Sequence, residues 1–101
     1  MVVIGDLPTD LEMVILDLLK DDDEMYGLQL VKADPDALYH NSIYVILTRM
    51  HSHGLVTTRL EKLNEGRKRG PRRRLYRITI RGRELRKARL EVEELLQKYS
   101  I

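Results

Sequence analysis

Residues 41–54, NSIYVILTRMHSHG, are the stretch from which the fold of this chain can be inferred. Their apolar members recur at spacings that place side chains on one face of a helix: Ile43, Ile46, Leu47 and Met50. Asn41 or Ser42 is suited to cap the start of such a helix, and Gly54 is suited to end it in a left-handed conformation. The sequence therefore predicts an amphipathic helix over about residues 41–53.

The face opposite this apolar stripe is polar and chemically varied. A rotation of about 100° per residue places on that face, or beside it, Asn41, Ser42, Tyr44, Val45, Thr48, Arg49 and Ser52. An amide, hydroxyls, a phenol, an apolar side chain and a guanidinium can contact DNA phosphates and base edges. The first six are therefore our candidate DNA-contacting residues on this helix, and the alternative is an ordinary solvated helix face.

Two shorter helical patterns precede this segment. The first begins near residue 9, where Thr9 and Glu12 have the spacing of a capping box. Its apolar side is formed by Leu11, Val14, Ile15, Leu18 and Leu19. The second spans about residues 25–33, and Gly27 near its start indicates close packing against a neighbour. Between the two helices, the acidic residues 21–24 are expected to form a solvated connector.

Beyond Gly54 the apolar period changes from that of a helix to about 2, the period of a β-strand. Alternating residues define the two strands: Val56, Thr58 and Leu60 in the first, and Tyr76, Ile78 and Ile80 in the second. Residues 64–71 between the strands, NEGRKRGP, are turn formers and charged residues. The sequence therefore predicts a β-hairpin with a long basic segment over residues 64–74.

The order of these elements indicates a fold class. Three short helices followed by a hairpin with a cationic tip are typical of a winged helix-turn-helix domain, in which the third helix enters the major groove of DNA and the hairpin, or wing, lies on phosphates. We therefore expect a mainly α fold with a small β-hairpin, with residues 1–81 as the DNA-binding domain.

The last segment, residues 82–101, has the pattern of one further helix. Apolar residues repeat along it at spacings of three and four, as in a two-heptad seam: Leu85, Ala88, Val92, Leu95 and Tyr99. An apolar stripe on a helix appended to so small a core would be exposed in a monomer. We therefore expect this helix to pair with a second copy in a homodimer.

The formal net charge of +2 conceals a division between the two halves of the chain. Residues 1–50 carry 3 basic and 10 acidic side chains, whereas residues 51–101 carry 15 and 6. Six cations in or beside the hairpin tip would repel one another unless a polyanion neutralised them, so we expect phosphate contacts from Arg67, Lys68, Arg69, Arg72, Arg73 and Arg74. Four more cations are expected on the solvated side of the terminal helix: Arg83, Arg86, Lys87 and Arg89.

Several classes of protein are disfavoured by the sequence. The absence of Cys excludes a disulfide framework, a thiolate metal site and a cysteine nucleophile. His51 and His53 are two residues apart and would point away from each other on a helix, and no catalytic or phosphate-loop motif is present. With no export signal and no long apolar run, we expect a cytoplasmic protein that is not an enzyme and needs neither a metal nor a cofactor.

Three segments resemble the PadR-like transcriptional regulators over about residues 11–96. Residues 25–30, MYGLQL, look like that family's helix-two motif, and residues 41–56 look like its recognition helix, ending here in HGLV. Residues 70–82, GPRRRLYRITIRG, resemble its wing strand. Val45 stands where the family usually has Pro, and the connector before the recognition helix is short.

This resemblance implies a DNA-binding transcriptional regulator, a repressor in our interpretation, that acts as a homodimer on a palindromic operator. Two alternatives stay open. The same plan, a short winged helix with one terminal dimerisation helix, also resembles the bacterial replication terminator protein. A winged helix can also serve only for protein–protein contacts, and weak dependence of binding on salt would indicate that role.

Overall fold

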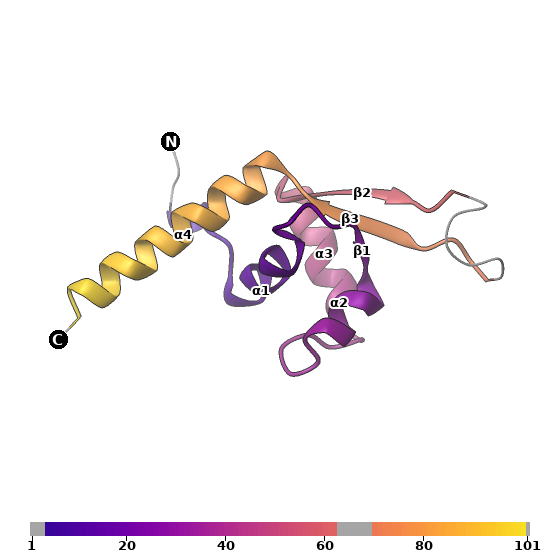
Figure 1. The fold of residues 1–101 in the computed structure, drawn as a ribbon, viewed down its shortest axis with the longest axis horizontal. Helices are drawn as coiled ribbons and strands as arrows, with labels where there is room; N and C mark the ends of the chain where they lie inside the picture. Colours follow the sequence, from indigo (N-terminus) through magenta and orange to yellow (C-terminus); the bar gives the residue numbers. More distant parts are fainter. Residues whose placement is uncertain (1–3, 63–69, 101) are drawn as a thin grey trace.

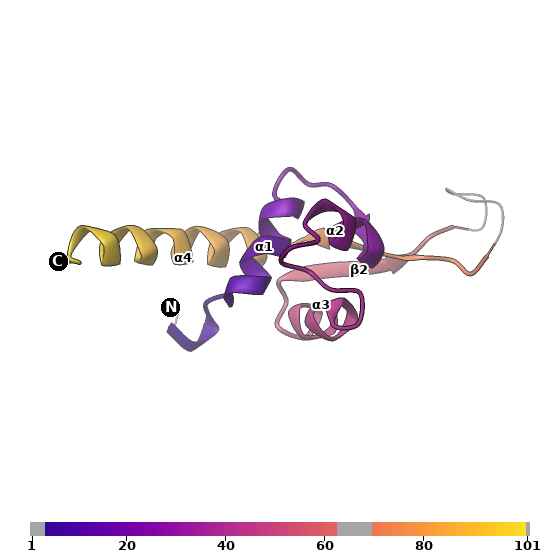
Figure 2. The same ribbon diagram turned by 90° about the horizontal axis from the view of Figure 1, so that it is seen from below.

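The chain forms four α-helices and a small sheet in a computed structural model (Figure 1). The structure describes residues 4–62 and 70–100. The elements in chain order are the 3-10 helix η1 (Ile4–Asp6), α1 (Asp10–Leu19), β1 (Met25–Tyr26), α2 (Gly27–Ala33), α3 (Ile43–Ser52), β2 (Val56–Leu60), β3 (Arg74–Ile78) and α4 (Ile80–Lys98). The hairpin β2–β3 extends from one side of the body formed by α1–α3, and α4 projects from the opposite side (Figures 1 and 2). The predicted winged-helix fold is confirmed.

Helix α1 begins at the predicted capping box. Thr9 N donates to Glu12 Oε1 at 2.9 Å, and Glu12 N donates to Thr9 Oγ1 at 3.3 Å. The predicted apolar face is partly wrong, because Leu16 is fully buried whereas Leu11 is 40% exposed. Glu12, whose side chain completes the cap, is also buried, so the inward face is rotated toward positions 12 and 16.

The sheet has three strands in the order β1-β3-β2, all antiparallel, where two were predicted. Residues 25–26, expected at the start of the second helix, instead pair with β3, Met25 opposite Tyr76. Ile80, expected in the second strand, is the first residue of α4, because Thr79 caps that helix by accepting from Gly82 N at 2.9 Å. Both errors arise where one element passes directly into the next.

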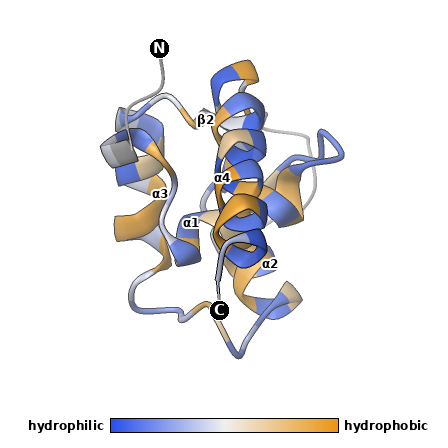
Figure 3. Cartoon of the chain, turned by 90° about the vertical axis from the view of Figure 1, so that its left-hand side faces the viewer, coloured by the Kyte–Doolittle hydropathy of each residue, from blue (hydrophilic) through white to orange (hydrophobic). Residues whose placement is uncertain are grey.

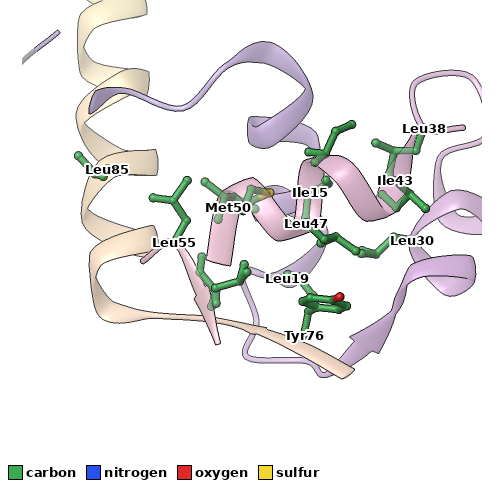
Figure 4. Close-up of a cluster of buried hydrophobic side chains, with 14 residues drawn as sticks. Ile15, Leu19, Leu30, Leu38, Ile43, Leu47, Met50, Leu55, Tyr76 and Leu85 are labelled. Carbon is green, nitrogen blue, oxygen red and sulfur yellow. The ribbon is translucent and has the colours of Figure 1, made fainter. Parts of the chain in front are cut away.

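The core lies between the three-helix body and the inner face of the sheet (Figure 4). It is built mainly from aliphatic side chains, among which Tyr76 is the aromatic member. The labelled residues in Figure 4 come from every helix of the body, from the segments before and after α3, from the sheet and from α4: Ile15, Leu19, Leu30, Leu38, Ile43, Leu47, Met50, Leu55, Tyr76 and Leu85. This core fixes α3 with its other face outward.

Gly82 allows the start of α4 to lie against the turn that follows α3. A Cβ at this position would overlap the backbone carbonyl of Leu55 and come within 3.0 Å of Ile78 Cγ1. Beside it, Thr79 Oγ1 donates to Gly54 O at 2.6 Å, where Gly54 has the predicted left-handed conformation with φ of 74°. The orientation of α4 therefore depends on a close approach between backbones that only glycine permits.

Gly82→Ala is expected to lower the free energy of unfolding by about 1–3 kcal/mol or more, because the overlapping atom is backbone and cannot rotate away. Urea denaturation followed by circular dichroism measures this change. Gly5→Ala is the matched control, since its Cβ would meet nothing within 4 Å, and it should shift stability by less than about 0.5 kcal/mol. Equal unfolding midpoints for the two variants would contradict the packing described for Gly82.

Arginines of α4 hold that helix against α1, which corrects the prediction that they lie on a purely solvated side. Arg86 Nη2 donates to Asp17 Oδ1 at 2.6 Å, and this hydrogen bond holds the pKa of Asp17 below its ordinary value. Arg89 bonds to Asp10 and, at 2.7 Å, to the backbone carbonyl of Pro8. Arg83 is the third arginine of this kind, since its Nη1 donates to Lys20 O at 2.6 Å, and together the three arginines fix the first half of α4.

The acidic connector is also more ordered than predicted. Glu24 accepts two hydrogen bonds from the guanidinium of Arg59 on β2, at 2.7 and 2.8 Å. Asp22 lies 3.5 Å from Arg77 on β3 and adopts a positive φ of 66°. The acids of the first half of the chain therefore neutralise cations on this side of the hairpin.

Candidate nucleic-acid interface

Helix α3 presents the predicted face to solvent. Ile43, Ile46, Leu47 and Met50 are buried as expected. On the opposite side Val45 is 61% exposed and Tyr44 is 48% exposed. Asn41, Thr48 and Arg49 are exposed and Ser42 is half-buried. Figure 2 shows α3 at the lower surface of the body, with the hairpin extending beyond it.

The start of α3 differs from the prediction in its capping. Ser42 is the N-cap residue, but its side chain makes no capping hydrogen bond to the helix. Its hydroxyl instead points to the Tyr39 carbonyl at 3.5 Å. Farther along the helix, Thr48 Oγ1 donates to the backbone carbonyl of Tyr44 at 2.7 Å. The hydroxyl hydrogen of Thr48 is therefore used within the helix.

Tyr44 is positioned by a close contact with α2. A Cβ on Gly27 would lie 2.8 Å from Tyr44 Cε1 and 2.9 Å from Cζ, so the ring packs directly on the backbone at the start of α2. The close packing predicted for Gly27 is confirmed. The contact holds the first turn of α3 against α2 and leaves about half of the Tyr44 side chain exposed beside the candidate interface.

The base of the wing separates the predicted cations into two groups. Arg72 and Arg74 are exposed. Arg73 turns inward: its Nε and Nη2 lie 2.9 and 2.8 Å from Glu61 Oε1, and its guanidinium stacks over the Tyr26 ring at 4.2 Å. The hydrogen bond with buried Glu61 raises the pKa of Arg73. Arg73 therefore joins the ends of β2 and β3, and its predicted contact with a phosphate stays a prediction.

The other three predicted cations of the wing, Arg67, Lys68 and Arg69, lie outside the described residues. Their assignment to phosphate binding stays a prediction. Within the described part, the hairpin base is also tied by Glu61 N donating to Arg73 O at 2.8 Å and by Arg73 N donating to Glu61 Oε2 at 2.9 Å. These bonds hold the two sides of the hairpin base together at residues 61 and 73.

A hollow of about 450 Å³ connects α2, the start of α3 and the wing base. Its lining includes an additional cation that sequence reasoning missed, Lys32 in the last turn of α2. The full lining is Tyr26, Leu28, Lys32, Tyr44, Pro71, Arg72, Arg73 and Arg74. In the sequence, Lys32 could have been noticed as the only basic residue of α2. In the structure, Lys32 extends the set of exposed cations from the wing toward α3.

The predicted dimerisation stripe divides into a buried part and an exposed part. Leu85 is 2% exposed and belongs to the core of the protomer, which corrects its assignment to the dimer seam, and Ala88 is half-buried. Farther along, Val92 is 36%, Leu95 54% and Tyr99 75% exposed. Figure 3, viewed from the side from which α4 projects, shows apolar segments recurring on this helix. Sequence reasoning missed Leu96, which is 67% exposed and one turn from Val92.

Residues 4–62 and 70–100 contain neither a cluster of metal-ligating side chains nor a membrane-spanning helix. Within those ranges, no group of three histidines, aspartates or glutamates could hold a metal ion. His51 and His53 are exposed at the end of α3. None of the helices in the described part of the chain is long and apolar enough to cross a membrane.

Comparison with known families identifies one match. The model of the transcriptional regulator PadR-like family matches residues 15–88 of this chain. A search of curated proteins finds no match.

Solved structures of similar fold come from several bacteria. A PadR family transcription regulator from Clostridium difficile R20291 has a TM-score of 0.70 at 18% identity, with 90% of this chain and 98% of that chain covered. A PadR family regulator from Eggerthella lenta has a TM-score of 0.65 at 29% identity, with 87% and 76% covered. Bacillus subtilis PadR, solved in complex with operator DNA, has a TM-score of 0.71 at 20% identity, with 81% of this chain covered. This chain matches 47% of the Bacillus protein.

Proposed function

Because this chain belongs to the PadR-like family of transcriptional regulators, we propose that it binds double-stranded DNA as a homodimer and represses transcription from a palindromic operator. The family is one of regulators and not of enzymes. Its member from Bacillus subtilis has been solved in complex with operator DNA. In this proposal α3 enters the major groove and the wing lies on phosphates.

The observation that carries this proposal is the exposed face of α3 beside exposed cations. Tyr44, Val45, Thr48 and Arg49 lie outward on a helix whose other face is locked into the core. The B-DNA major groove admits one α-helix, whose side chains can then reach base edges. Arg72, Arg74 and Lys32 flank the start of this helix and can neutralise the phosphates on either side of the groove.

The homodimer is supported by the second half of α4. The described residues 90–100 are all exposed, and they include four large apolar side chains in the stretch from Val92 to Tyr99. A projecting helical segment of this length gains little stability on its own. A second copy would cover Val92, Leu95, Leu96 and Tyr99, and a two-fold axis there would present two α3 helices to half-sites about one helical turn apart.

Arg49→Ala tests the assignment of α3 to base contacts. The substitution is expected to weaken binding to the preferred duplex by about 1–3 kcal/mol, because it removes a bidentate guanidinium contact to guanine, and to change binding to a scrambled duplex much less. Fluorescence anisotropy with both duplexes measures the two affinities. Lys87→Ala, an exposed cation on α4, is the control, and equal losses on the two duplexes would assign Arg49 to phosphates instead.

A further inference from the structure

The centre of the exposed face of α3 offers methyl groups. The buried face of this helix is formed by Ile43, Ile46, Leu47 and Met50. The direction opposite the centre of this buried face passes between Val45 and Thr48. At about 100° per residue, each of these two side chains lies about 30° from that outward direction. Val45, at 61%, is the most exposed large apolar side chain of α3. At the middle of the helix, Val45 and Thr48 are therefore the residues expected to contact the groove.

Thr48 contributes its methyl group more than its hydroxyl. Its Oγ1 donates to the Tyr44 carbonyl at 2.7 Å, one turn back along the helix. This bond consumes the only hydrogen of the hydroxyl and leaves an oxygen that can accept but not donate. Val45 has no polar atom in its side chain. The two central positions therefore present three methyl groups and no free side-chain donor.

The base pairs differ in how well their major-groove edges can pack against a surface of methyl groups. Guanine presents two acceptors, N7 and O6, which would lose their water and gain no donor from Val45 or Thr48. Thymine presents a 5-methyl group, which packs against apolar side chains. Building on the proposed function, we propose that Val45 and Thr48 recognise thymine methyl groups at the centre of each half-site.

The spacing of the two residues sets the spacing of the thymines. Three residues of an α-helix rise about 4.5 Å, and successive nucleotides of one B-DNA strand are about 3.4 Å apart. Val45 and Thr48 therefore reach neighbouring base pairs. Arg49, which is exposed beside them, supplies donors next to this methyl pair. The preferred half-site then contains two adjacent A·T pairs. Bases outside this pair of positions are specified by other residues.

Deoxyuridine is the direct probe, because it differs from thymidine only in the missing methyl group. The duplex used is the tightest binder recovered from a random pool, with each thymine replaced singly by deoxyuridine. Each loss of one buried methyl should weaken binding about fourfold. We expect this loss at two adjacent positions in each half-site and at none of the other thymines.

Two variants assign the two positions to their side chains. Thr48→Ser removes the methyl group but keeps the hydroxyl that bonds to Tyr44 O. Val45→Ala shortens an exposed side chain, and alanine is a good helix former, so the helix is kept. Each variant should bind duplexes with thymine or uracil equally well at one of the two positions. At the other position, replacing thymine by uracil should still weaken binding of that variant. Thr57→Ser, which removes an exposed methyl from β2, is the control and should leave both penalties unchanged.

Three results would overturn the proposal. If every uracil duplex binds as tightly as its thymine parent while a scrambled duplex binds weakly, DNA recognition stands and methyl recognition fails. If uracil weakens binding but neither variant removes the penalty, other residues read the thymines. If no selected duplex binds better than a scrambled one, sequence-specific DNA binding fails, and this inference fails with it.

Discussion

Val92→Glu is expected to convert the proposed dimer to a monomer. The carboxylate would lie within the exposed stripe of Val92, Leu95, Leu96 and Tyr99, where a second copy would have to bury it without a partner. A monomer engages a single half-site, and without the linked second half-site binding to a two-half-site duplex should weaken by about 100-fold or more. Sedimentation velocity and anisotropy on the same samples measure the two effects.

The control for this variant is Glu91→Ala, an exposed position on the same turn of α4. It should remain dimeric and bind DNA as the parent protein does. The result that contradicts the account is a parent protein that sediments as a monomer at micromolar concentration. The exposed leucines of α4 would then have another role.

Replacing Arg67, Lys68 and Arg69 together by Ala is expected to weaken binding to every duplex alike. Contacts to phosphates add affinity without distinguishing sequences, so a preferred and a scrambled duplex should lose the same factor. The slope of log affinity against log salt should become shallower by about 0.9 for each phosphate that the variant no longer neutralises. An anisotropy titration across a salt series measures both quantities.

A triple variant with the same change in net charge but outside the wing separates local from general electrostatics. Lys20, Lys87 and Lys98, all exposed and all in or beside α1 and α4, provide this control when replaced by Ala. The control should keep a slope close to that of the parent. If the wing variant binds both duplexes with the parent's affinity and slope, the basic tip does not contact DNA.

The fold was predictable where local periodicity is strong. The spacing of apolar residues predicted α3 within about two residues at each end, and Thr9 with Glu12 identified the start of α1. The strand β1 was not predictable in the same way, because Met25 and Tyr26 are strand residues only through pairing with β3, about fifty residues away in the sequence. A two-residue strand has no period of its own.

The candidate site was predictable to the extent that it follows from helix geometry. Rotation along α3 was enough to identify Val45 and Thr48 as outward residues, and the structure agrees. The partners of Arg73 were not predictable, because a run of arginines gives no indication that one of them is held by Glu61 and stacked on Tyr26. Partners of this kind are set by the pairing of β2 with β3 and not by sequence neighbours.

The same limit applies to the terminal helix. A seam of five apolar residues was visible in the sequence, but Leu85 packs into the core of its own protomer. The reason is the close approach at Gly82, which draws the first turns of α4 onto Leu55. Only the part of the seam beyond Ala88 projects from the body.

Selection of bound duplexes from a random DNA pool tests the central claim most directly. A homodimer with one α3 helix per half-site should enrich a two-fold palindrome whose half-site centres are about 10 base pairs, or a multiple of one turn, apart. Recovery of no enriched sequence after repeated rounds, with the protein folded and dimeric, would contradict sequence-specific recognition and would leave a nonspecific DNA-binding or protein-binding role.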